Sequence, residues 1–358
     1  MLGELDSERL APSGTLAMMI YSCMLCGACG NVCPTGIDIP EVIYKGRALL
    51  KGSYRRGRVL RTILARSMSR LDSLFSVMRI CQKIMYKPLY DAGMIGYVPE
   101  ISPVPFHKSV QVYKNIKKTG RVAVFAGCSV NYFYPHLGNA LSNILLSKGY
   151  EVVLFKGEAC CGAPLRSMGL EDEARKLAEK NIELFNKVRA AAVISLCPTC
   201  TMVIRNQYPR LAGGTINNIM DVNEFLVEHT MAEGLETHPA VVTYHDPCHL
   251  SFGLGVKDKP RQILQGIKGI EFVEMEHADE CCGFAGFFSM HFKNISRSIG
   301  KKKISSISDT QADTVVTSCP GCIMQLESLR KETRAKFNIK HIVEVIDEAM
   351  HGENTPAF

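Results

Sequence analysis

The stretch AAVISLCPTC, residues 191–200, joins a short apolar segment directly to a Cys-x-x-Cys pair. A close copy, DTVVTSCPGC, occupies residues 313–322. Short runs of apolar and β-branched residues are typical of buried strands. Each copy therefore predicts a strand that runs into Cys197 or Cys319 and presents two thiols at its carboxyl end.

The cysteines that precede these two stretches share one spacing. From Cys128 the intervals to the next pair and then to Cys197 are 32 and 36 residues, and from Cys248 they are 33 and 37 residues. The two sets are Cys128, Cys160, Cys161, Cys197 and Cys200, and Cys248, Cys281, Cys282, Cys319 and Cys322. Two sets of five that lie about 120 residues apart indicate an internal repeat.

Strands and helices alternate between these cysteines. Apolar runs at 121–128, 151–155, 191–196, 241–245, 270–275 and 314–319 predict strands, and helical periodicity follows Pro135, surrounds 174–185, follows Pro260 and covers 295–307. This alternation predicts an α/β fold with two tandem Rossmann-like domains and parallel sheets, at 118–236 and 237–350. The cysteines should gather at the carboxyl ends of the strands, where such sheets bind ligands.

A further run, CMLCGACGNVCP at residues 23–34, has the spacing of a cubane 4Fe–4S motif. In two-cluster ferredoxins the fourth cysteine of such a run serves the other cluster, yet only one run occurs here. Either a second run lies outside this sequence, or Cys23, Cys26, Cys29 and Cys33 serve a single cluster. We expect residues 1–50 to form a small α-helical, ferredoxin-like segment that is incomplete.

Residues 51–117 predict a basic helical linker. Its arginines are Arg55, Arg56, Arg58, Arg61, Arg66, Arg70 and Arg79. Such an amphipathic helix could lie on an anionic membrane or dock a partner, but we favour a linker that packs its apolar side on the protein. Three prolines between Tyr97 and Phe106 predict an extended tether, and we expect Cys81 to be a buried, inert thiol.

Composition narrows the class of protein. The 358 residues include 15 cysteines and no tryptophan, with a net charge of +7. Without a secretory signal or an apolar run of membrane-spanning length, we expect a cytoplasmic protein, or one peripheral to the inner face of the membrane. Cytoplasmic thiols stay reduced, so this cysteine count indicates metal binding rather than disulfides. Sparse aromatic–basic interleaving argues against nucleic-acid binding.

Five thiols per set exceed the four of a tetrahedral zinc site or an ordinary cubane. Zinc would explain the Cys-x-x-Cys pairs and a vicinal disulfide would explain each doublet, but each leaves part of the set unexplained, so we favour an iron–sulfur cluster. Gly127, Gly162, Gly283 and Gly286 could let backbone N–H groups approach cluster sulfurs, or could be ordinary loop glycines. His245 and His249 flank Cys248; a ligand role is conceivable, although a core or supporting role is favoured.

These motifs resemble the tandem CCG (cysteine-rich) domain family, through FAGCSVNYFYP, CCGAPL, CPTC, YHDPCHL, CCGFAG and SCPGCIMQL. The family includes the catalytic subunit of heterodisulfide reductase and iron–sulfur subunits of glycolate (D-lactate) oxidase and anaerobic glycerol-3-phosphate dehydrogenase. The resemblance implies one or two noncubane 4Fe–4S clusters, each held by one set of five cysteines. The segment GELDSER resembles the one that follows the first cluster run in relatives, so we expect that run to be missing here.

The resemblance implies two functions. The first is an iron–sulfur electron-transfer subunit that takes electrons from a flavoprotein dehydrogenating a 2-hydroxy acid or glycerol 3-phosphate. Its acceptor would be a quinone, a haem subunit or a thiol carrier, and another chain could supply the second ferredoxin-type motif. The alternative is a catalytic subunit that reduces a disulfide at paired noncubane clusters. A structural zinc protein remains a third class.

Overall fold

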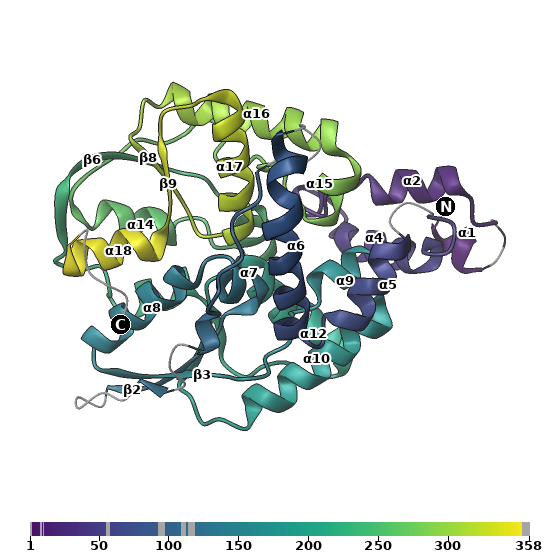
Figure 1. Cartoon of the computed structure of the whole chain (residues 1–358), viewed down its shortest axis with the longest axis horizontal. Helices are drawn as coiled ribbons and strands as arrows, with labels where there is room; N and C mark the ends of the chain where they lie inside the picture. Colours follow the sequence, from purple (N-terminus) through teal and green to yellow (C-terminus); the bar gives the residue numbers. More distant parts are fainter. Residues whose placement is uncertain are drawn as a thin grey trace.

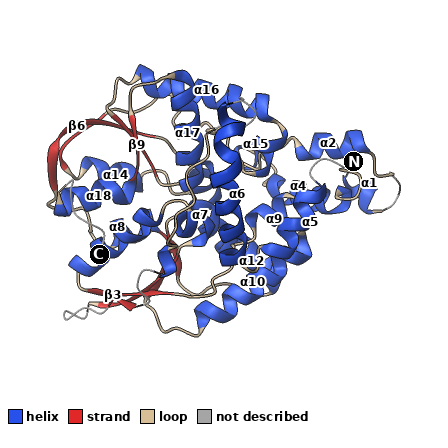
Figure 2. Cartoon of the chain, viewed as in Figure 1, coloured by secondary structure: helices blue, strands red, loops and turns tan. Residues whose placement is uncertain are grey.

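The computed structural model describes residues 2–7, 9, 11–54, 58–91, 97–108, 112–113 and 119–352. Two α/β units lie one above the other, and a helical N-terminal segment extends to one side (Figure 1). Figure 2 shows the two sheets at separate places in the molecule, each with helices beside it. The predicted α/β fold with two parallel sheets is confirmed.

The first sheet has the strand order β1-β3-β2-β4-β5. Its strands are β1 (Val112–Tyr113), β2 (Gly120–Phe125), β3 (Tyr150–Leu154), β4 (Ala192–Ser195) and β5 (Ile219–Asp221). All pairs are parallel except β1 with β3. Val122 pairs with Val152 on one side and Ala192 on the other, and all three are buried, as expected for a sheet covered on both faces.

The second sheet is fully parallel, in the order β7-β6-β8-β9. Its strands are β6 (Glu236–Tyr244), β7 (Lys268–Phe272), β8 (Thr314–Thr317) and β9 (Asn338–His341). The sequence did not predict the edge strands β1, β5 and β9. Each has only two to four residues, too few to display a period.

Helices cover both sheets. The longer ones are α8 (Pro135–Ser147), α10 (Glu171–Asn186), α13 (Val222–Glu228), α14 (Lys259–Gln265), α16 (Lys293–Asp309), α17 (Pro320–Thr333) and α18 (Ile342–His351). Shorter ones are α7 (Gly127–Tyr132), α9 (Ala163–Ser167), α11 (Pro198–Met202), α12 (Tyr208–Ala212) and α15 (Phe287–His291). Proline begins α8, where no hydrogen bond is lost because the first N–H groups of a helix have no partner within it. Three acidic residues in the first turn of α10 stabilise that helix through its dipole.

The two units share one apolar core. Leu137 and Leu141 of α8 belong to the same buried cluster as Ile342 and Ile346 of α18. At the rim of this contact the amide of Asn143 donates a hydrogen bond to Asp347 over 3.2 Å. Separating the two units would expose the apolar side chains of both α8 and α18 to water. We therefore expect the units to keep a fixed relative position.

The N-terminal segment consists of α1 (Leu2–Asp6), α2 (Gly14–Tyr21), α3 (Ala28–Asn31) and α4 (Ile39–Leu50). It docks on the first unit, because the Tyr21 hydroxyl donates to the carbonyl of Met168 over 2.9 Å. Arg166, only 2% exposed, lies 2.7 Å from Glu41 of α4 and over the ring of Tyr44. A buried guanidinium and a carboxylate thus fix α4 to α9.

The basic linker forms α5 (Arg58–Ser67) and α6 (Leu71–Asp91), while Arg55 and Arg56 lie outside the described residues. Phe75 of α6 is buried and stacks on Tyr132 with ring centroids 4.1 Å apart. Farther along α6 the apolar side chains face solvent, with exposed fractions of 58% for Ile80 and 69% for Ile84. The expectation that the linker packs its apolar side on the protein is therefore wrong for this part of α6.

Cys81 is exposed, which corrects the expectation of a buried thiol. It lies on the same outward side of α6 as Ile80 and Ile84. Residues 97–105 form no helix or strand, as the prolines predicted, and the Gln82 side chain binds the backbone of Pro99 and Ile101. No helix among the described residues is long and apolar enough to cross a membrane.

We predict that Glu41→Ala destabilises the folded protein by about 3 kcal/mol, because Arg166 would remain buried without its main partner. Urea unfolding followed by circular dichroism measures this loss. The control is Glu183→Ala, which removes an exposed pair with Lys187 and should leave stability nearly unchanged. Equal losses in the two variants would contradict the prediction.

Candidate functional site

Each Cys-x-x-Cys pair lies where a strand gives way to a helix. Cys197 is the residue that caps α11 and Cys319 the residue that caps α17, and a proline occupies the first turn of both helices. Cys200 and Cys322 lie in those first turns, within the two helices. The sequence prediction that these thiols gather at the carboxyl ends of β4 and β8 agrees with this geometry.

The first set of cysteines forms a connected group. The thiols of Cys128 and Cys160, then of Cys160 and Cys161, and then of Cys161 and Cys200 lie close enough to change one another's pKa. Cys160, Cys161 and Cys200 are buried, and Cys128 is partly exposed. The loop that carries the doublet thus folds back over the ends of β2 and β4, as the repeat required.

The second set repeats this arrangement. The Cys248 thiol contacts Cys281, and Cys281 contacts its neighbour Cys282. Cys282 and Cys322 then lie with their sulfur atoms 3.4 Å apart. Cys319 closes the group through its hydrogen bond with Cys322. The repeat visible in the sequence is therefore also a repeat of side-chain positions.

The two sets meet at a shared boundary, where the thiols of Cys197 and Cys319 lie close enough for each to change the pKa of the other. The residues that precede these cysteines hold the boundary in place. His341 of β9 lies 3.1 Å from the carbonyl of Leu196, and the Ser318 hydroxyl donates to Asn223 over 3.0 Å. The carboxyl ends of β4 and β8 are thus joined across the two units, and all ten cysteines form one continuous group.

Several of these thiols favour the thiolate form that cluster ligation needs. Hydrogen bonds from Cys160 and Cys200 lower the pKa of Cys161 to about 6. In the second set, hydrogen bonds from Cys248 and Cys282 hold the pKa of Cys281 well below its usual range. The thiols that donate these hydrogen bonds have raised pKa values. Closely spaced thiols of this kind are suited to bind the iron of a cluster, because each thiol loses its proton when it binds iron.

The backbone beside the first set leaves room for a bulky group. Gly127 has a positive φ of 63°, and a Cβ there would lie 3.1 Å from the sulfur of Cys200. The N–H groups of Gly127 and Ala126 donate to the carboxylate of Glu158, over 2.5 and 3.2 Å. Burial raises the pKa of Glu158 to about 8, against the effect of these two donors. Sequence reasoning missed Glu158, which lies two residues before the doublet.

The other glycines differ in role. The N–H of Gly283 donates to the sulfur of Cys281 over 3.3 Å, so this backbone does approach a candidate ligand. Gly162 and Gly283 both let the doublet loop pack closely on a helix, on Ala174 of α10 and on Ser296 of α16. Gly286 has open space where its side chain would lie.

The N-terminal cysteines lie beside the second set. Burial raises the pKa of Cys26, and the charge of Cys281 adds to the effect. Cys29 is exposed, and the hydroxyl of Thr35 lowers the pKa of the half-exposed Cys33. The imidazole of His249 lies 2.8 Å from the Thr199 hydroxyl and 3.1 Å from the carbonyl of Leu25, so it joins the N-terminal loop to α11.

His245 has a different environment. It is fully buried, and neither ring nitrogen has a hydrogen-bond partner among the described residues. Within that part of the chain, it forms with Cys282 and Cys322 the one trio of potential ligand atoms that lie within 4.8 Å of each other. Burial lowers the pKa of His245 to about 3, and the charge of Lys303 adds to this, so the ring is neutral. The sequence identified both histidines but could not tell them apart.

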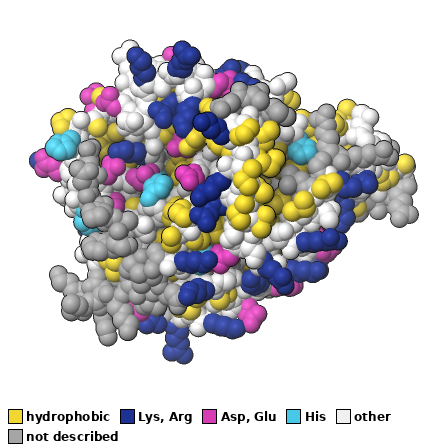
Figure 3. All heavy atoms as spheres, in the orientation of Figure 1, with side chains coloured by type: hydrophobic (Ala, Val, Ile, Leu, Met, Phe, Trp, Pro, Cys, Tyr) yellow, Lys and Arg dark blue, Asp and Glu magenta, His cyan; other side chains and the backbone are white. Residues whose placement is uncertain are grey.

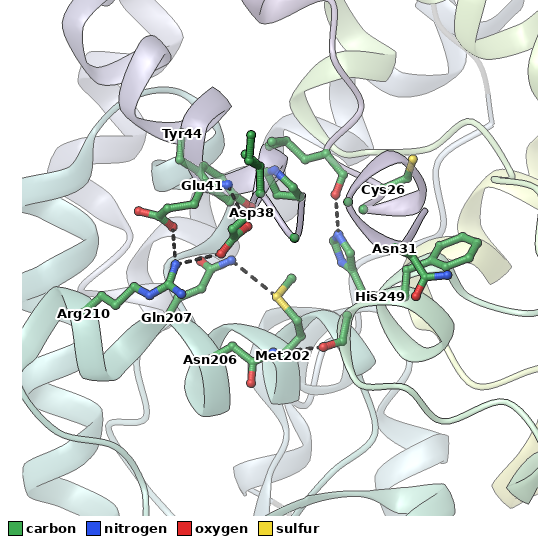
Figure 4. A pocket seen from close by; sticks show the side chains of 18 residues that line it. Cys26, Asn31, Asp38, Glu41, Tyr44, Met202, Asn206, Gln207, Arg210 and His249 are labelled. Atoms are coloured by element: carbon green, nitrogen blue, oxygen red, sulfur yellow. Dashed lines mark hydrogen bonds and ion pairs between the residues drawn. The ribbon is translucent and has the colours of Figure 1, made fainter. Parts of the chain in front are cut away.

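A cavity of about 360 Å³ adjoins the N-terminal cysteine loop (Figure 4). Two π-helical turns, η2 (Val203–Gln207) and η3 (His249–Gly253), contribute to its wall, and sequence analysis predicted neither. Across the cavity Arg210 lies 2.8 Å from Asp38. The cavity borders Cys26 but none of the ten cysteines of the two sets.

We predict that Gly127→Ala lowers the iron retained after anaerobic reconstitution, because its Cβ crowds the Cys200 sulfur. The matched control is Gly157→Ala, which has a similar φ of 87° but open space around it. Both substitutions strain the backbone, so both should cost about 1–2 kcal/mol of stability. Equal iron content in the two variants, measured per folded chain, would refute the crowding argument.

Comparisons with known proteins agree with this geometry. The family model described as "Cysteine-rich domain", CCG, matches residues 122–205 and 242–327. A fumarate reductase (CoM/CoB) subunit from Methanothermobacter marburgensis is 31% identical over 96% of this chain, which spans 64% of that relative's length. A dihydromethanophenazine:CoB–CoM heterodisulfide reductase subunit from Methanosarcina barkeri is 26% identical, over 92% of this chain and 78% of its own.

A third relative is matched over nearly its whole length. Lactate utilization protein A of Oceanobacillus iheyensis is 30% identical, over 65% of this chain and 98% of its own. Together with the two matched cysteine-rich segments, this confirms the resemblance found in the sequence and supports iron–sulfur clusters as the type of cofactor. The chain belongs to the family of iron–sulfur oxidoreductase proteins that are built on two tandem CCG domains.

Proposed function

We propose that this protein is an iron–sulfur electron-transfer subunit of a multi-subunit oxidoreductase. One observation carries the proposal: the three groups of cysteines form a row. Cys26 of the N-terminal run lies within electrostatic reach of Cys281 in the second set, and Cys319 of the second set contacts Cys197 of the first. Clusters bound at these positions would follow one another in the order N-terminal run, second set, first set.

The cysteines would hold these groups as follows. Cys23, Cys26, Cys29 and Cys33 would bind a ferredoxin-type 4Fe–4S cluster, with a further ligand from another chain if the motif is incomplete. Each set of five would bind one noncubane 4Fe–4S cluster. Iron–sulfur clusters supply one-electron transfer at potentials that their protein surroundings adjust. The protein's part is to bring the thiols together and to fix their spacing through the boundary between Leu196 and His341.

A separate flavoprotein is the electron donor that fits this chain best. The sequence has no flavin or nicotinamide fingerprint of its own, so an organic substrate must be oxidised elsewhere. The relative named lactate utilization protein A supports a 2-hydroxy acid as that substrate, with glycolate and glycerol 3-phosphate as related candidates. The acceptor would be a quinone, a haem subunit or a thiol carrier.

The second candidate is disulfide reduction, favoured by the direct contact of two complete cysteine sets. The relative named as a heterodisulfide reductase subunit supports it. The cavity beside the N-terminal loop borders Cys26 and none of the ten cysteines, so it is not the entry route that a disulfide substrate would need.

The outward face of α6 suits a peripheral membrane location. Val77, Ile80 and Ile84 recur along one side of the helix with exposed fractions of 58–69%. Lys83 and Lys87 on α6 and Arg58 and Arg66 on α5 are also exposed, and Figure 3 shows cationic side chains beside apolar ones. Apolar side chains with neighbouring cations match the surface of an anionic bilayer. This location would bring the subunit to a membrane-bound acceptor.

The first test is iron content and electron paramagnetic resonance of the anaerobically purified chain, with and without a disulfide substrate. A relay predicts about eight irons bound by the two sets, at four per cluster, and a spectrum that the disulfide does not change. A disulfide-dependent signal would instead establish the reductase. Four irons or fewer in the two sets, or bound zinc, would refute the two-cluster assignment.

The second test is sedimentation with lipid vesicles. We expect the wild-type chain to bind vesicles that contain phosphatidylglycerol, weakly in high salt, and not vesicles of phosphatidylcholine alone. The double variant Ile80→Ser, Ile84→Ser should lose most of this binding without losing stability, because both side chains are exposed. The control is Ile295→Ser, an equally apolar change at a 51% exposed site on α16. Equal binding by all three proteins would exclude α6 as the lipid contact.

A further inference from the structure

The two cysteine sets have different neighbours despite their matching geometry. Counting back three residues from the first cysteine of each set gives Phe125 in one unit and His245 in the other. The strand register agrees, since Val124 and Tyr244, which precede them, hold the same place against β4 and β8. Both side chains are fully buried. An apolar ring thus stands in the first unit where an imidazole stands in the second.

A second pair of equivalent positions differs in charge. Gly162 packs on Ala174 and Gly283 packs on Ser296, which aligns α10 with α16. Seven residues farther along these helices are Asn181 and Lys303. Both are buried, and both donate to carbonyl groups of the loop before the doublet: Asn181 to Ala159 and Lys303 to Ala278. A neutral amide in the first unit is replaced by an ammonium group in the second.

His245, Lys303 and the second set form one local group. The charges of Lys303 and Cys282 act on each other, and Lys303 also acts on His245. His245 is within 4.8 Å of the sulfur atoms of Cys282 and Cys322, and its ring N–H has no other partner among the described residues. A buried N–H without a partner is costly, so a sulfur acceptor at this place would stabilise it.

Two carboxyl groups, Glu158 and Asp221, lie beside the first set. Glu158 accepts hydrogen bonds from the backbone next to Cys128, and Asp221 at the end of β5 is under the influence of Cys197. A carboxyl group is negatively charged when it is ionised and neutral when it is protonated. Carboxyl groups therefore cannot stabilise an added electron as an ammonium group can.

We propose that His245 and Lys303 give the redox centre of the second set a higher reduction potential than that of the first set. Reduction adds negative charge, which a buried cation stabilises, and hydrogen bonds to cluster sulfurs act in the same direction. The cluster of the second set would then be reduced before the cluster of the first set. This inference rests on the proposed function only in that both sets must hold clusters.

The test is a potentiometric titration of the reconstituted chain, followed by electron paramagnetic resonance. Each variant installs the residue of the other repeat: His245→Phe and Lys303→Asn for the second unit, and Asn181→Lys for the first. We expect the two cysteine sets of the wild type to give two one-electron waves, apart from the wave of the N-terminal cluster. His245→Phe and Lys303→Asn should each lower only the upper wave by tenfold or more in equilibrium constant, about 59 mV. Asn181→Lys should raise only the lower wave.

The matched control is Lys302→Asn, which makes the same charge change on the exposed side of α16 and should move neither wave. Lys303→Arg keeps the charge and should keep the upper potential. Should Lys303→Asn fail to bind iron, His245→Phe and Asn181→Lys decide the question alone. Unchanged waves in these variants, or a shift of the lower wave on changing His245, would overturn the proposal. Iron content, read separately, shows whether both sets hold clusters at all.

Discussion

The arrangement of the cysteines depends on the contact between the carboxyl ends of β4 and β8. The hydrogen bonds of His341 with Leu196 and of Ser318 with Asn223 hold the two strand ends together. Cys197 and Cys319 are the next residues along the chain, so they cannot separate while these bonds persist. Two sites that began as copies of one motif thereby become a single group of ten thiols. The shared apolar core of α8 and α18 keeps this contact from sliding.

Much of this could be predicted from the sequence, because the features are local. A strand that runs into Cys-Pro-x-Cys fixes the position of two thiols, and the repeat supplies the rest of each set. The α/β fold follows from the same alternation. Contacts between distant segments were out of reach: neither the stacking of Arg166 on Tyr44 nor the link from His249 to Leu25 has a sequence signal. Cys81 was predicted wrongly, since its helix is amphipathic but turns part of its apolar side outward.

The comparison of the two repeats adds a general point about duplicated sites. The backbone, the cysteines and the glycines that pack against α10 and α16 stay alike, because they determine whether a cluster can be held. The two repeats differ at positions such as 125 and 245, or 181 and 303, which touch the site without forming it. In this way a duplicated fold can acquire two different electronic environments with no change in its ligands.

The docking of the N-terminal segment has a consequence for biosynthesis. Residues 14–54 are made before both α/β units, yet their anchors are Arg166, Met168 and His249, which lie in those units. Since domains fold as they emerge, this segment must wait for both units before it gains its final contacts. During that interval Cys23, Cys26, Cys29 and Cys33 stay open to the machinery that delivers iron and sulfide. The order of synthesis thus leaves the outermost cysteines of the row accessible for longest.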